Sequence, residues 1–109
     1  MSEFLPERDW KHLRTVHVAA LDRYCARVLE ESEAVIRSSD GSSHQRYLKL
    51  FRLLQDRDRT LARAFDDLRR STAIEHLAAL IRLQLLAREE LAGFTEETVT
   101  TATRWAYGP

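Results

Sequence analysis

The sequence of 109 residues has few of the residues that make turns, with only three glycines and two prolines. Tight turns depend on such residues, so a fold of many short strands joined by hairpins is disfavoured. Apolar residues make up 44% of the chain and charged residues 31%, which is typical of a globular protein. We therefore expect residues 1–109 to form a single domain around one apolar core.

Other features of secreted and membrane proteins are also absent. The single cysteine, Cys25, excludes an internal disulfide bond, and the first ten residues lack the apolar run of a signal peptide. The most apolar stretch, residues 77–87, is interrupted by Arg82 and Gln84 and is far shorter than the roughly 20 residues that span a bilayer. These absences predict a cytoplasmic protein with no membrane segment.

The chain also has no excess of charge of either sign, because 17 basic residues balance 17 acidic residues. The whole molecule therefore has no net field that would attract nucleic acid or an anionic membrane. A net charge near zero also does little to keep copies of the chain apart, which leaves self-association open.

Apolar residues instead recur every three or four positions along most of the chain, which is typical of amphipathic helices. A first helix is predicted over residues 6–37. A second is predicted over residues 43–70, where Ser42 and Gln45 have the spacing of a capping box. Its stripe should meet a neighbour along its whole length and consists of Tyr47, Phe51, Leu54, Asp58, Leu61, Phe65 and Leu68.

A third helix is predicted over residues 72–92, opened by a second capping box at Thr72 and Glu75. A kinked helix continuous with the second is the alternative. Gly93 is expected to end the third helix in a left-handed conformation, and a short segment over residues 96–105 follows. The predicted fold is all-α: an antiparallel bundle of three main helices with a short C-terminal helical segment, which we expect to form a homodimer.

Three polar residues interrupt the apolar stripes and are candidates for a binding site. In an antiparallel hairpin that turns near residues 40 and 41, Asp58 lies level with Arg23 and Tyr24, while His17 lies about 9 Å further along the axis. The Tyr24 hydroxyl, or a guanidinium from Arg23 or Arg27, is able to bond the carboxylate. One interpretation is a polar pocket for a small ligand or for acid–base chemistry. The other is a buried structural pair, or an Asp58 that reaches solvent, with His17 as an ordinary core residue.

The sequence offers no pattern for metal binding or catalysis. Helical di-iron centres need several inward carboxylates and paired Glu-x-x-His motifs, and the nearest approach here is Asp9 with His12. Cys25 lies beside the main stripe, where a half-buried inert thiol is the simpler interpretation. We expect no metal, no cofactor and no catalytic residue.

The second helix is the only basic element of the chain. Residues 43–71 hold eight Lys or Arg and four Asp, so this segment is a candidate for contacts to nucleic acid phosphates. Pairs four residues apart, such as Arg52 with Asp56 and Arg63 with Asp67, are able to neutralise much of this charge within the helix. We therefore favour a solvated face over nucleic-acid binding.

Extra leucines widen the apolar bands of the second and third helices. They are Leu48, Leu50, Leu53, Leu80, Leu83 and Leu86. Either they form a surface for another copy or a helical partner, or the first helix, the C-terminal segment and Trp105 cover them. We favour the surface, and hence a non-enzymatic protein–protein interaction module such as a small regulatory adaptor or inhibitor. The alternatives are a ligand-binding bundle or minor enzyme centred on Tyr24 and Asp58, and nucleic-acid binding.

Overall fold

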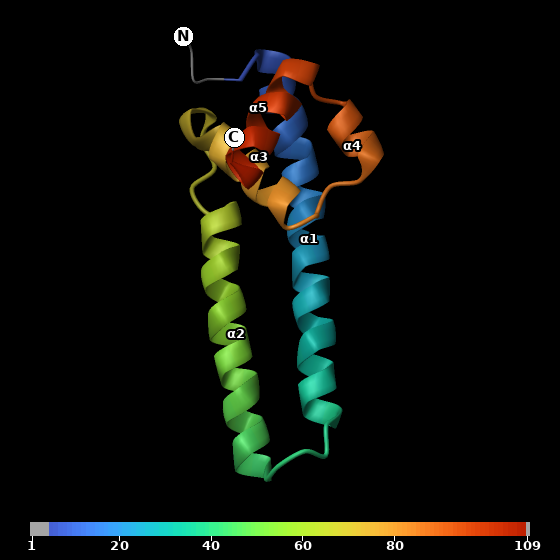
Figure 1. The fold of residues 1–109 in the computed structure, drawn as a ribbon, viewed down its shortest axis with the longest axis vertical. Coiled ribbons are helices and arrows are strands. Elements are labelled where there is room, and N and C mark those ends of the chain that lie inside the picture. Colours follow the sequence, from blue (N-terminus) through green and yellow to red (C-terminus); the bar gives the residue numbers. More distant parts are fainter. Residues whose placement is uncertain (1–4, 109) are drawn as a thin grey trace.

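The computed structural model describes residues 5–108, and every regular element within that range is helical. Helices α1 (Glu7–Arg37) and α2 (Ser43–Phe65) form a long antiparallel hairpin, and the other helices gather around one end of it (Figure 1). These are the 3-10 helix η1 (Arg70–Thr72), α3 (Ala73–Arg82), α4 (Arg88–Ala92) and α5 (Glu96–Tyr107). The predicted all-α fold is confirmed.

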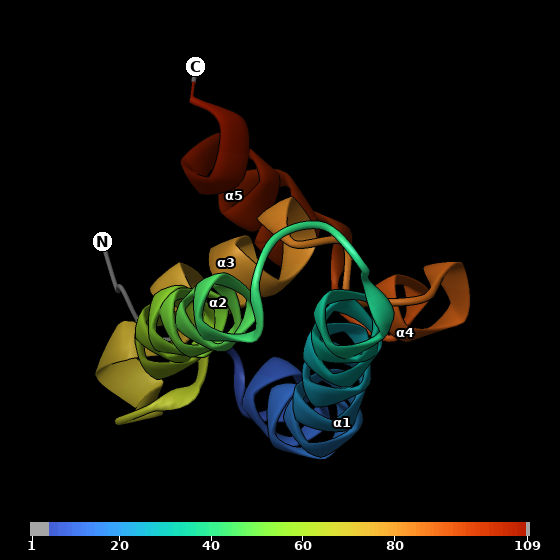
Figure 2. The ribbon, with the colours of Figure 1, turned by 90° about the horizontal axis from the view of Figure 1, so that it is seen from below.

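The molecule is elongated because the hairpin projects well beyond the other helices. It measures 55 × 24 × 24 Å and has a radius of gyration of 16.7 Å. A compact domain of this length has a radius of gyration of about 13 Å. Viewed along the hairpin from its turn, α3 and α5 lie on one side of the plane through α1 and α2, and α4 lies beside α1 (Figure 2). The hairpin therefore has one side that the rest of the described chain leaves uncovered.

The hairpin begins and turns where the sequence predicts. Pro6 precedes α1, and Glu7 and Asp9 occupy its first turn, where the positive end of the helix dipole favours acidic residues. At the turn, Gly41 adopts a φ of 85°, in the left-handed region that favours glycine. The Gln45 N–H donates to the Ser42 hydroxyl at 3.1 Å and the Ser42 N–H donates to the Gln45 side-chain oxygen at 2.8 Å. The first capping box is therefore present as predicted.

Two helices end earlier than the sequence suggests. Helix α2 stops at Phe65 instead of residue 70, and α3 stops at Arg82 instead of residue 92, with α4 as a separate short helix. Beyond these ends, Asp67 and Gln84 adopt left-handed conformations with φ of 60° and 56°. Glutamine does not signal such a stop, and the helical segment predicted over 72–92 is divided into α3 and α4 at this point.

The end of α3 is stabilised by contacts from a distant part of the chain. The Leu85 N–H donates back to the Leu80 carbonyl at 3.0 Å, the bond expected when the preceding residue is left-handed. From α1, Arg27 donates to the Leu83 and Gln84 carbonyls at 2.6 and 2.5 Å. Arg23, one turn earlier, donates to the Leu85 carbonyl at 2.8 Å and pairs with Glu90. These arginines satisfy carbonyls that a continuing helix would have used.

Gly93 is needed for space and not for a left-handed turn. Its φ of −75° is that of an ordinary right-handed residue, so the predicted left-handed helix end was wrong. A Cβ atom at this position would overlap the His12 ring, whose Nε2 donates to the Glu90 carbonyl at 2.6 Å. The absent side chain lets α4 pack closely against α1.

The apolar core lies in the part of the molecule where α3 and α5 pack against the start of α1 and the end of α2, which we call the head. Leu13 of α1, Leu77 and Leu80 of α3, and Leu85 are fully buried there. Helix α5 covers α3. No helix in the described part of the chain is long and apolar enough to cross a membrane.

A buried carboxylate fixes α5 to α1. Asp9 is completely buried and accepts hydrogen bonds from the Thr95 N–H at 2.9 Å, the Thr95 hydroxyl at 2.7 Å and the Thr98 hydroxyl at 2.5 Å. Burial alone would raise the pKa of Asp9, but the bonds from Thr98 and Thr95 outweigh it and lower the pKa. Asp9 is therefore an ionised group held at the start of α5.

Candidate functional site: an apolar face on the hairpin

The half of the hairpin furthest from the head has no buried core. Ser32 is the last buried residue of α1 and Ala64 the first of α2, and none of residues 33–63 between them is buried. Amphipathic helices owe most of their stability to an apolar face packed against a neighbour. Two helices alone cover each other on one side only, so this part of the hairpin retains apolar surface.

The stripe of α2 that was expected to meet a neighbour is exposed in this half. Tyr47, Phe51 and Leu54 are 64%, 50% and 44% exposed. The side of α2 that faces α1 instead follows Arg46, Leu50, Leu53 and Arg57, which share one face by helical spacing. The Arg46 guanidinium donates to the Ile36 carbonyl, and the Tyr24 hydroxyl donates to the Arg57 carbonyl at 3.1 Å.

Helix α1 adds a second exposed stripe to the same side of the hairpin. Val18, Leu29 and Ile36 are exposed and are 11 and 7 residues apart, which places them on one face. Cys25, seven residues after Val18, lies on this face and is half-buried. Arg23 and Arg27 contact the head. Cys25 and Leu29 each follow one of these arginines by two residues, which is a rotation of about 200° around α1, so both point away from the head.

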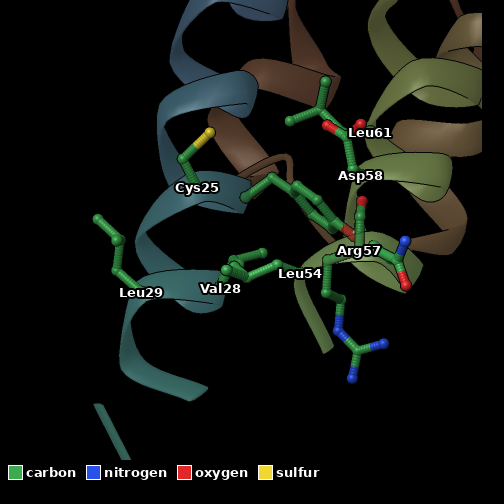
Figure 3. Close-up of a pocket in the computed structure, with 9 residues that line it drawn as sticks. Cys25, Val28, Leu29, Leu54, Arg57, Asp58 and Leu61 are labelled. Atoms are coloured by element: carbon green, nitrogen blue, oxygen red, sulfur yellow. The ribbon is translucent and has the colours of Figure 1, made fainter. Parts of the chain in front are cut away.

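A groove runs between these two stripes. Its volume is about 470 Å³, and Figure 3 shows Cys25, Val28 and Leu29 of α1 on one side and Leu54, Asp58 and Leu61 of α2 on the other. We call the groove and its flanking stripes the hairpin face. It consists of Val18, Cys25, Leu29 and Ile36 of α1 and Tyr47, Phe51 and Leu54 of α2.

Of the three polar site candidates, Tyr24 and Asp58 both line the groove, whereas His17 does not. Tyr24 is buried and its hydroxyl is used by the Arg57 carbonyl, whereas Asp58 is exposed at the edge of the groove. The expected Tyr24–Asp58 pair is therefore wrong: a carbonyl one residue away takes its place. The interpretation in which Asp58 reaches solvent describes its position.

His17 lies in the head, away from Asp58. Its ring centre is 5.0 Å from that of Phe65 and 6.3 Å from that of His76. Burial, and then the nearby His76, lower the pKa of His17. His76 itself is buried, with Nδ1 2.9 Å from the Thr72 carbonyl and Nε2 2.7 Å from the Asp66 carbonyl. The two rings help to pack the end of α2 against α1 and α3.

The leucines expected to form an interface have different positions. Leu80 is fully buried in the head, so its assignment to a surface was wrong, and Leu83 and Leu86 are partly buried against the core. Leu48, Leu50 and Leu53 are half-buried, and Leu50 and Leu53 face α1. Sequence reasoning missed the exposed residues because it treated the Tyr47–Phe51–Leu54 stripe as internal. Trp105, which the less favoured interpretation placed over these leucines, is itself exposed.

The basic charge of α2 is partly neutralised across the hairpin. Arg57 pairs with Glu31 of α1 at 2.8 Å, and this pairing raises the pKa of Arg57 and lowers that of Glu31. Arg70 pairs with Glu7 at 2.8 Å. Since α2 ends at Phe65, Asp67 lies outside it, and the predicted pairing of Arg63 with Asp67 along one helix was wrong.

Within residues 5–108, no three His, Cys, Asp or Glu side chains come close enough to hold a metal ion. Comparison with models of protein families, with curated proteins and with solved structures found no match. The hairpin face is the candidate site, and the support for it comes from the structure of this chain and not from a related protein.

Proposed function

We propose that this chain is a non-enzymatic protein–protein interaction module, a small regulatory adaptor or inhibitor that acts through the hairpin face. One observation carries the proposal: Phe51, Tyr47, Leu54 and Leu29 are exposed on one side of a hairpin that has no buried residue between positions 33 and 63. Clustered apolar side chains of this kind mark association sites on soluble proteins, with aromatic residues as frequent anchors.

The shape of the face suits a helical partner. Two parallel ridges with a groove of about 470 Å³ between them can accept the apolar side of another helix or helix pair. The small-ligand alternative is less favoured: Tyr24 and Asp58 both line the groove, but the Tyr24 hydroxyl is used by the Arg57 carbonyl and Asp58 is exposed.

The test compares two exposed aromatic residues, Phe51 on the hairpin face and Trp105 on α5, which are 50% and 56% exposed. Tagged wild-type chain, Phe51→Glu and Trp105→Glu are used to capture proteins from the native cells, with quantification by mass spectrometry. We expect the same proteins to bind wild type and Trp105→Glu and to be lost from Phe51→Glu. Equal capture by all three chains would contradict the proposal.

A further inference from the structure

We propose that the occupant of the hairpin face is a second copy of this chain, and that the two hairpins form an antiparallel four-helix bundle with both heads at the same end. This inference rests on the proposed function and names its partner. Three observations lead to it: the apolar stripes on both helices, the opposite balance of charge on α1 and α2, and the size of the face.

The two apolar stripes are able to pack against their own copies. Two hairpins stacked face to face enclose the stripes of α1 and α2 within four helices, which is the usual arrangement that buries amphipathic helix pairs. Residues 33–63 then gain the core that they lack in one chain. The chain as a whole carries no net charge, so two copies do not repel each other.

Charge determines which helix faces which. Residues 43–55 of α2 carry no acidic residue and, besides Arg46, which is turned toward α1, carry Lys49 and Arg52. Residues 26–37 of α1 carry two arginines and three glutamates, of which Glu31 pairs with Arg57 of the same chain. Pairing α2 with α2 of the second copy would place basic residues together. Pairing α2 with α1 of the second copy brings opposite charges together, which selects a two-fold axis parallel to the hairpin.

This axis also sets a specific contact. Tyr24 lies level with Arg57 in one chain, because its hydroxyl bonds that carbonyl, and the helices are antiparallel. Asp22 is therefore level with Arg59. A two-fold axis parallel to the hairpin leaves heights unchanged, so Asp22 at the outer edge of α1 lies opposite Arg59 of the second copy. Both side chains are exposed in the single chain.

The size of the face matches a stable dimer. The stripe from Val18 to Ile36 is about 27 Å long and two helices are about 20 Å wide, which gives about 500 Å² in projection. Accessible surface exceeds its projection because side chains are curved and protrude. The face thus approaches the roughly 800 Å² per partner of a standard specific interface.

The first test measures association by sedimentation equilibrium on the full chain. We expect wild type and Trp105→Glu to dimerise and Phe51→Glu to dissociate about 1,000-fold more readily, because a central aromatic anchor contributes about 30-fold and the symmetry counts it twice. Circular dichroism checks that Phe51→Glu remains helical. A wild-type chain that stays monomeric at high concentration, or a Phe51→Glu chain that still dimerises, would overturn the inference.

The second test examines the arrangement by exchanging charges. Asp22→Arg alone and Arg59→Glu alone each place like charges opposite one another twice, and we expect each to weaken the dimer by about tenfold. A mixture of the two variants restores both contacts in the heterodimer, which should form as readily as wild type. Small-angle scattering should give a longest dimension close to the 55 Å of one chain. No gain on mixing, or a much longer particle, would overturn the shared orientation.

Cys25 provides an independent measure because it lines the groove. Its reaction with a thiol reagent should be lost in proportion to the dimer fraction, while in Phe51→Glu its rate should not depend on concentration. A rate for the wild-type dimer equal to that of Phe51→Glu would contradict coverage of the groove. If the wild type is monomeric but its captured proteins still depend on Phe51, only the inference that the partner is a second copy is overturned. If neither dimerisation nor protein capture depends on Phe51, the proposed function is overturned as well.

Discussion

Asp9 determines where α5 begins, although it lies 86 residues before Thr95 in the chain. Its carboxylate accepts one backbone and two hydroxyl hydrogen bonds in a fully buried position. Bonds to an ionised acceptor are stronger than bonds between neutral groups. The sequence indicates Thr95 as a cap for a C-terminal segment, but it gives no sign that the cap is itself bonded by α1.

Replacing Asp9 with Asn should destabilise the fold by about 2 kcal/mol, because the amide keeps the shape but loses the charge that strengthens three hydrogen bonds. Urea denaturation of the two proteins measures the difference. Glu7→Gln serves as the control, since Glu7 also lies in the first turn of α1 but is exposed and loses only its surface pair with Arg70. A loss for Asp9→Asn no larger than that for Glu7→Gln would show that the buried carboxylate is not important for stability.

Gln84 is an exposed residue in a left-handed conformation, with φ of 56°. A side chain makes this conformation unfavourable by about 1–2 kcal/mol, and glycine avoids that cost while adding about 0.4–1 kcal/mol of unfolded-state entropy. We expect Gln84→Gly to stabilise the chain by about 0.5–1 kcal/mol in thermal or urea unfolding. Gln84→Ala retains the strain and should give no comparable gain, and equal effects of the two substitutions would contradict this explanation.

At the level of whole helices, α2 shows what a periodic pattern can and cannot predict. The alternation of apolar residues and the Ser42–Gln45 capping box indicate a helix and its first residue correctly. They do not say which of two adjacent apolar faces meets α1, because Leu50 and Leu53 are as apolar as Phe51 and Leu54. The choice depends on long-range bonds such as that from Tyr24 to the Arg57 carbonyl.

Neighbouring leucines on α2 provide a direct test of this choice of face. Leu53 is half-buried on the side toward α1, whereas Leu54 is exposed toward the groove. At concentrations low enough to keep the chain monomeric, Leu53→Ala should cost about 1–2 kcal/mol, about half the cost at a fully buried site. Leu54→Ala should cost much less in the same denaturation experiment. Equal losses would mean that the two faces are equally covered within one chain.

The ends of α3 and α4 were not predictable for a related reason. The left-handed Gln84 has no glycine or proline to mark it, and the freed carbonyls are satisfied by Arg23 and Arg27 some 60 residues earlier. At Gly93 the opposite holds: the glycine signals a helix end in the sequence, but it is required because the His12 ring lies so close. Helix ends that depend on tertiary contacts are therefore not marked in the local sequence.

At the level of the whole molecule, the two parts of the chain have different sources of stability. The head has a closed core around α3, and the far half of the hairpin has none within one chain. Opening free energies in proteins follow such differences in buried contacts. Amides of residues 33–63 should therefore exchange with solvent hydrogen faster than those of α3 in dilute samples. Uniform protection along the chain at low concentration would contradict this division.

The stability of the whole fold should decrease in two steps as the pH falls. The pKa of His17 is lowered from 6.5 by burial, so below pH 6.5 the unfolded chain binds a proton that the folded chain binds less readily. The pKa values of Glu31 and Glu90 are lowered from 4.5 by their arginine partners, Arg57 and Arg23. The pKa of Asp9 is lowered from 3.8 by its threonines, despite its burial. These carboxylates stabilise the fold above their unfolded pKa values and lose that contribution as the pH falls through the folded values.

Urea denaturation at a series of pH values should therefore show one decline just below pH 6.5 and a second, larger one below about pH 4.5. His17→Gln removes the titrating ring, so we expect it to abolish the first decline and leave the second. Asp9→Asn should reduce only the lowest part of the second decline. A first decline that persists in His17→Gln would assign it to another histidine. A fold that grows more stable as the pH falls from 6.5 to 4.5 would contradict the direction of the His17 shift. A fold that grows more stable as the pH falls below 4.5 would contradict the directions of the three carboxylate shifts.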